Sequence, residues 1–206
     1  MENNENELGL DDLLSDGKKT ITPKATADTS SEEPISTSLQ ILKNVKALAT
    51  MAVQRGTTSE NGPGQVMREL NSDKDVSKGY TVRVTFNHGK RIEFIDVRKN
   101  GPAKKPDSYC KQSPDITLRV SRDRMVYLTI DKRRVKPLPL LDRPQVPSTI
   151  DGGMFDSPED VRVFGPIDRM GENTLNFLLS FTQDAIKGMP NLGSTSPPNQ
   201  MVPVSG

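Results

Sequence analysis

Residues 80–137 decide the fold, and they read YTVRVTFNHGKRIEFIDVRKNGPAKKPDSYCKQSPDITLRVSRDRMVYLTIDKRRVKP. Three stretches within them, TVRVTF, ITLRVS and MVYLTI, alternate apolar and polar residues. Because successive side chains of a strand point to opposite faces, each stretch predicts a strand with one apolar and one polar face. A fourth stretch, RIEFIDVR, breaks the alternation at Phe94 and Ile95, which indicates either a β-bulge or a strand covered on both faces.

Turn signals connect these four strands in sequence order. Asn87–His88–Gly89–Lys90 predicts a hairpin, since glycine adopts positive φ without steric cost, and Ser121–Arg122–Asp123–Arg124 predicts a second one. Residues 99–114 carry one glycine and three prolines and predict a long loop between them. The stretch therefore predicts a four-stranded antiparallel β-meander.

Two helices are expected on either side of the meander. Residues 36–55 place apolar side chains at helical spacing, with a serine or threonine at the start and Gly56 after the end. Residues 173–187 form a second such pattern, ended by Gly188 and Pro190. Residues 57–64 suggest a linker, residues 65–70 a short helical turn, and Ser157 the start of a short helix that Gly165 and Pro166 end.

These patterns predict an α+β fold, a four-stranded antiparallel β-meander packed with two main helices. Only 33% of the 206 residues are apolar, which indicates one domain at residues 36–189 between disordered tails at 1–35 and 190–206. The chain has no apolar run long enough to span a bilayer, and it has a single cysteine. Because its first residues are acidic and polar, we expect no secretory signal peptide. We therefore expect an intracellular protein that is not secreted.

Charge is distributed unevenly along the chain. Residues 76–145 hold 17 basic and 7 acidic side chains, whereas the segments 1–35 and 146–206 are net acidic. A basic middle of this kind can neutralise phosphates of nucleic acid or of lipid headgroups. The candidate polyanion-binding residues are Arg83, Arg91, Lys99, Lys104, Lys105, Lys111, Arg119, Lys132, Arg133, Arg134 and Lys136.

The alternative interpretation is a solvated sheet face whose arginines pair with Glu93, Asp96 and Asp123. Aromatic residues among the basic ones are few, because only Tyr127 on the outer face and Tyr109 in the long loop are placed to stack on a base. That scarcity argues against sequence-specific recognition of single strands and leaves contact with the nucleic-acid backbone open.

Catalytic signals are missing from the sequence. His88 is the only histidine, and it falls in a predicted turn, while Cys110 is the only cysteine. Phosphate-binding glycine motifs are absent as well. We therefore expect a protein that is not an enzyme and that has no catalytic residues, no metal site and no cofactor.

Two short segments suggest partners. Leu10, Leu13 and Leu14 would share one face of a helical turn in the acidic N-terminal tail, which predicts docking to a protein partner. Lys132, Arg133, Arg134 and Lys136 form a run of the kind that acts as a nuclear localisation signal.

The arrangement of residues 36–187, a basic sheet between two helices after a polar tail, resembles the matrix proteins of negative-strand RNA viruses, those of plant rhabdoviruses in particular. The resemblance implies a structural protein of the virion that self-associates and contacts ribonucleoprotein, RNA or an anionic membrane, in the host nucleus or cytoplasm. The N-terminal tail differs, because it is acidic where a membrane-binding arm is often basic. The alternative is a regulatory protein that binds the RNA or DNA backbone and recruits a partner through its leucine-containing tail.

Overall fold

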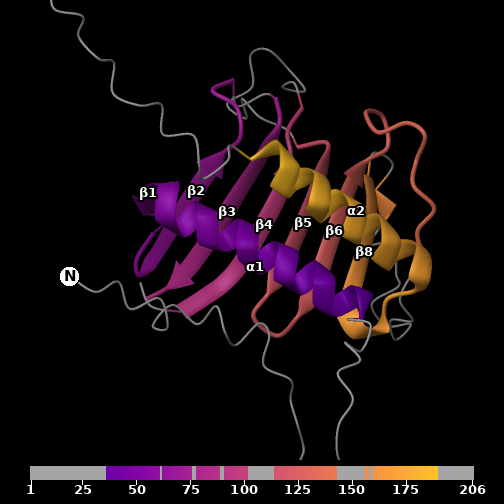
Figure 1. Ribbon diagram of the computed structural model, residues 1–206, viewed down its shortest axis with the longest axis horizontal. Helices are drawn as coiled ribbons and strands as arrows, with labels where there is room; N and C mark the ends of the chain where they lie inside the picture. Colours follow the sequence, from indigo (N-terminus) through magenta and orange to yellow (C-terminus); the bar gives the residue numbers. More distant parts are fainter. Residues whose placement is uncertain are drawn as a thin grey trace, which may run out of the picture.

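Two helices lie together on one face of an antiparallel sheet (Figure 1). The computed structural model describes residues 36–60, 62–75, 78–88, 91–101, 114–142, 156–157 and 160–189. Helix α1 spans Thr37–Arg55 and helix α2 spans Glu172–Gly188, as the apolar spacing predicted. The expected tails at 1–35 and 190–206 lie outside the described residues.

The sheet is larger than the predicted meander. Its strands run antiparallel in the order β1-β2-β3-β4-β5-β6-β8-β7, and seven of them have at least four residues, while β7 has two. The strands are β1 (Thr57–Glu60), β2 (Gln65–Asn71), β3 (Tyr80–Asn87), β4 (Arg91–Lys99), β5 (Ile116–Ser121), β6 (Met125–Asp131), β7 (Asp156–Ser157) and β8 (Asp160–Pro166). The meander itself is confirmed as β3 to β6, so the α+β class is right and the count of four strands is wrong.

Three local predictions fail for one reason. Residues 57–60 were expected in a linker and 65–70 in a helical turn, but they form the hairpin β1–β2, which extends the sheet beyond β3. The short helix expected after Ser157 is replaced by β7 and β8, and β8 pairs with β6 along its whole length. In each case pairing with a strand already present in the sheet overrides a weak local preference.

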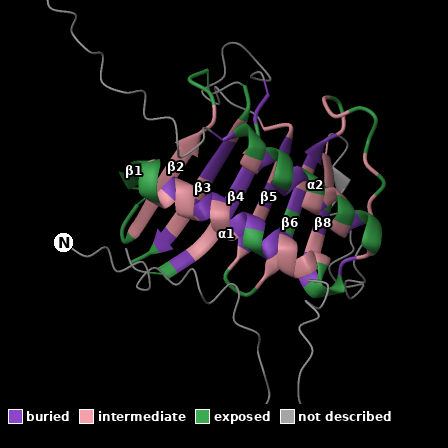
Figure 2. Ribbon diagram, in the orientation of Figure 1, coloured by how far each residue is buried: buried purple, intermediate pink, exposed green. Residues whose placement is uncertain are grey.

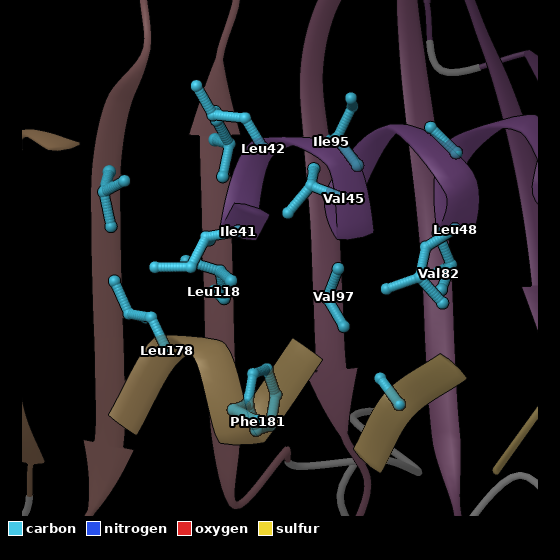
Figure 3. Close-up of a cluster of buried hydrophobic side chains, with 14 of the residues drawn as sticks. Ile41, Leu42, Val45, Leu48, Val82, Ile95, Val97, Leu118, Leu178 and Phe181 are labelled. Carbon is cyan, nitrogen blue, oxygen red and sulfur yellow. The ribbon is translucent and has the colours of Figure 1, made fainter. Parts of the chain in front are cut away.

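The core lies between the helices and the sheet. Ile41, Leu42, Val45 and Leu48 of α1 and Leu178 and Phe181 of α2 point at the apolar face of the central strands (Figure 3). Val82, Val84, Ile95, Val97, Leu118, Val120, Leu128 and Ile130 form that face, and all are buried (Figure 2). A hydrogen bond of 3.1 Å from Asn44 Nδ2 to Thr182 Oγ1 joins the two helices.

The helix ends are capped in two different ways. Ser36 Oγ accepts a hydrogen bond from the Leu39 amide, and Gly56 follows the last turn of α1, as expected. Helix α2 begins at Gly171 without a side-chain cap of its own. Instead Asp142, from the segment after β6, accepts hydrogen bonds from the amides of Asn173 and Thr174.

Candidate nucleic-acid interface

The face of the sheet opposite α1 and α2 is here called the open face. One side chain from each of six neighbouring strands meets there in a row, because the cross-strand partners are directly opposite one another. This central row consists of Glu69, Arg83, Asp96, Arg119, Tyr127 and Phe164, on β2, β3, β4, β5, β6 and β8. The row is charged at the β2 end and aromatic at the β8 end.

Ion pairs neutralise the charged half of the central row. Arg83 donates to Glu69 Oε2 at 2.5 and 2.8 Å. Arg119 donates to Asp96 at 2.6 and 2.9 Å, and Arg98 reaches the same carboxylate at 2.9 Å. The hydrogen bond to Asp96 raises the pKa of Arg119 above its ordinary value. The pairing of Asp96 agrees with the solvated-face interpretation, whereas Glu69 is a partner that the sequence does not indicate.

Aromatic rings form the other half of the row. The rings of Tyr127 and Phe164 lie 4.4 Å apart between centroids. Phe94, two residues before Asp96 on β4, has the guanidinium carbon of Arg119 4.9 Å from its ring centre. Tyr127 keeps 40% of its surface exposed, which leaves a ring on the open face for an incoming group. Three aromatic residues and Arg119 thus lie side by side, and we call them the aromatic platform.

Two members of the aromatic platform were not among the predicted site residues. Phe94 reaches the open face because the β3–β4 register shifts between Thr85 and Phe86, leaving Glu93 as an extra residue of β4. The bulge was one of two interpretations of the adjacent Phe94 and Ile95, and it is confirmed. Phe164 lies on β8, which had been expected as a helix. The alternation of Val161, Arg162, Val163 and Phe164 was the signal for a strand.

The predicted basic residues are spread over the molecule. Arg83 and Arg119 lie in the central row, Arg91 is exposed at the start of β4, and Lys99 is exposed at its end. After β6, Arg133 lies 3.7 Å from Asp131, and Arg134 lies 3.3 Å from Asp115 and 3.8 Å from Asp131. The Arg134 side chain is only 18% exposed, so its guanidinium is directed to these carboxylates rather than to solvent. Lys136 is exposed. Lys132 belongs to the same segment and is half-buried.

Other predicted site residues lie outside the described part of the chain. They are Lys104, Lys105 and Lys111 of the long loop, with Tyr109 and Cys110, and Leu10, Leu13 and Leu14 of the N-terminal segment. His88 lies in the turn after β3, as expected, and has φ of 48°. None of the helices that the structure describes has the length and apolarity needed to cross a bilayer.

Comparisons with protein-family models, with curated proteins and with solved structures found no match.

Proposed function

We propose that this protein is a non-enzymatic, structural nucleic-acid-binding protein whose open face contacts single-stranded RNA. The observation that carries the proposal is the aromatic platform of Phe94, Arg119, Tyr127 and Phe164 on the face opposite both helices. Bases of a single strand stack on aromatic rings and on guanidinium planes, with little dependence on sequence. The resemblance to viral matrix proteins is consistent with this role, in which the RNA belongs to a ribonucleoprotein.

The charges of the open face favour stacking over simple attraction of phosphates. Arg83 and Arg119 are paired to carboxylates, so they contribute less to phosphate binding than free cations do. Each stacked base contributes about 1–3 kcal/mol. We therefore expect a binding affinity that depends on the rings and falls only moderately as salt is raised.

Affinity of the purified protein for a fluorescent single-stranded oligouridylate tests the proposal. Tyr127→Ala should weaken binding by about tenfold, because one stacked base is lost. Tyr127→Phe keeps the ring and should bind as the wild type does. Equal affinities of all three proteins would overturn the platform as the binding surface.

A second measurement on the same protein and RNA separates the assembly role from the regulatory one. Light scattering of the protein–RNA mixture should show growth into oligomers if the protein assembles with RNA and self-associates. Binding by a protein that remains monomeric would point to the regulatory nucleic-acid-binding protein instead.

A second candidate, contact with an anionic membrane, is favoured by the segment after β6. Leu138 and Leu140 are 45% and 77% exposed and follow the basic residues Lys132 to Lys136. Exposed leucines beside cations are suited to insertion between acidic headgroups. In flotation with phosphatidylserine vesicles, the double variant Leu138→Ser and Leu140→Ser should lose binding. Unchanged flotation of that variant would remove this candidate.

A further inference from the structure

A cleft lies at one end of the sheet, between the β3–β4 and β5–β6 turns. Its volume is about 680 Å³, within the range of about 300–1,000 Å³ that is usual for small-molecule sites. It is lined by Asn87, His88, Arg91, Ile92, Glu93, Phe94, Ser121, Arg122 and Asp123. The aromatic platform reaches the cleft through Phe94, which belongs to both.

The β-bulge of β4 shapes this cleft. The extra residue, Glu93, is held from two sides: its carbonyl oxygen accepts a hydrogen bond of 3.3 Å from the Arg122 amide, and its carboxylate accepts one of 3.3 Å from Gln65 Nε2. Ile92 before it is buried in the core, and Phe94 after it lies on the open face. The walls of the cleft therefore belong to the sheet and to its turns.

The lining combines three kinds of group. Phe94 offers an aromatic surface, and Arg91 is an exposed cation for which the described residues offer no partner. Arg122 adds a second guanidinium, and arginine is the residue best suited to bind phosphate oxygens. Glu93 and Asp123 are acceptors, and they suit hydroxyl and amino groups rather than an anion.

We infer that the cleft binds one ribonucleotide unit, at the end of the RNA strand that crosses the aromatic platform. The base would stack on Phe94, the phosphate would lie against Arg91 and Arg122, and the ribose hydroxyls would donate to Glu93 or Asp123. A ribonucleotide uses all three kinds of group, whereas inorganic phosphate or a lipid headgroup would leave the ring unused. The inference rests on the proposed function and adds a defined end to its binding surface.

Nuclear magnetic resonance of the full chain tests the inference, because His88 is the only histidine and lines the cleft. The His88 ring signals are followed at constant pH during titration with uridine 5′-monophosphate, deoxyuridine 5′-monophosphate, uridine or inorganic phosphate. Uridine 5′-monophosphate should shift these signals in a saturable way. Each of the other three compounds should bind about tenfold or more weakly, since each lacks at least one of the recognised groups.

Two variants identify the site. Arg91→Ala should weaken binding of uridine 5′-monophosphate by about tenfold, through loss of a charged hydrogen bond. Lys43→Ala removes another exposed cation, on α1, which covers the opposite face of the sheet, and should bind like the wild type. Absence of a saturable shift, equal binding of inorganic phosphate, or equal binding by Arg91→Ala would each overturn the inference.

Failure of the cleft assignment can be distinguished from failure of the proposed function. If oligouridylate binding depends on Tyr127 while the mononucleotide leaves His88 unaffected, only the cleft assignment fails. If oligouridylate binding does not depend on Tyr127, the proposed function fails whatever the cleft binds.

Discussion

Asp96 is the residue that orders the open face. Its carboxylate is 1% exposed and receives hydrogen bonds from Arg119 and Arg98. Burial of an unpaired carboxylate costs folding free energy, so Asp96 needs the two guanidinium groups as partners. The same hydrogen bonds fix the positions of both arginine side chains. Through Arg119 the same carboxylate fixes the cation that covers Phe94.

Asp96→Asn should lower the free energy of unfolding by about 1–3 kcal/mol, because two charge-assisted hydrogen bonds become weaker neutral ones. Urea denaturation at neutral pH measures this change. Asp168→Asn, at an exposed position of the short helix Ile167–Arg169, is the control and should unfold like the wild type. Equal stability of Asp96→Asn and the control would show that the carboxylate is not essential to the sheet.

Arg134 and Lys136 belong to one basic run but should behave differently. Arg134→Ala removes a partner from Asp115 and from Asp131, which is 2% exposed, and should destabilise the fold by about 1–3 kcal/mol. Lys136→Ala removes an exposed cation and should leave stability unchanged. Thermal melts of the two variants measure the difference, and similar melting temperatures would contradict the ion-pair role of Arg134.

At the scale of elements, helix α2 depends on a residue distant in sequence. Asp142 Oδ2 accepts from the Asn173 amide at 2.7 Å and from the Thr174 amide at 3.3 Å. Its other oxygen accepts from the Asn173 side chain at 3.0 Å. Amides at a helix N-terminus need such acceptors, so Asp142 provides the cap that Gly171 lacks.

This cap makes stability depend on pH. The hydrogen bond from the Asn173 side chain, with those from the Asn173 and Thr174 amides, lowers the pKa of Asp142 below its ordinary value. A lowered folded-state pKa gives stability that is present above the unfolded value of about 3.9 and is lost as pH falls through the folded value. Asp142→Ala should therefore be less stable than the wild type at pH 7, and the difference should shrink below about pH 4. Urea denaturation across this range measures it, and a difference independent of pH would contradict the ionised cap.

The sequence was sufficient to predict both helices and strands β3 to β6, since each shows its own periodicity over several turns or residues. It was insufficient for β1, β2 and β8. All seven residues of β2 are half-buried, so this strand has no clean apolar face, and its pairing with β3 decides its structure. The same limit hid part of the candidate site, because Arg83, Arg119 and Tyr127 lie on predicted strands, whereas Phe164 lies on β8.

The ion pairs of the open face were only partly predictable from the sequence, which indicated Asp96 as a partner for arginines but not Glu69. The basic face was predicted from charge along the chain, but Glu69 lies opposite Arg83 only because β2 joins the sheet. The position of Phe94, by contrast, was indicated by the sequence. The break in the apolar–polar alternation of β4 at Phe94 and Ile95 predicted a bulge, and this bulge places the Phe94 ring on the open face. Register between strands thus determines both the net charge and the aromatic content of the open face.

At the scale of the whole molecule, the two faces of the sheet carry different side chains. One face buries the apolar side chains of the strands under α1 and α2 (Figure 3). The other presents the central row, the aromatic platform and, at the end near the β3–β4 turn, the cleft. Binding through the open face would leave the core undisturbed, as expected of a structural protein that assembles with nucleic acid without unfolding.

The most direct test of this account is to map the backbone and aromatic resonances of the protein during titration with oligouridylate. Shifts should be largest for the signals of Phe94, Arg119, Tyr127 and Phe164, while the signals of exposed residues of α1 and α2 should remain unchanged. Shifts that gather on the two helices, with the signals of the open face unaffected, would contradict it.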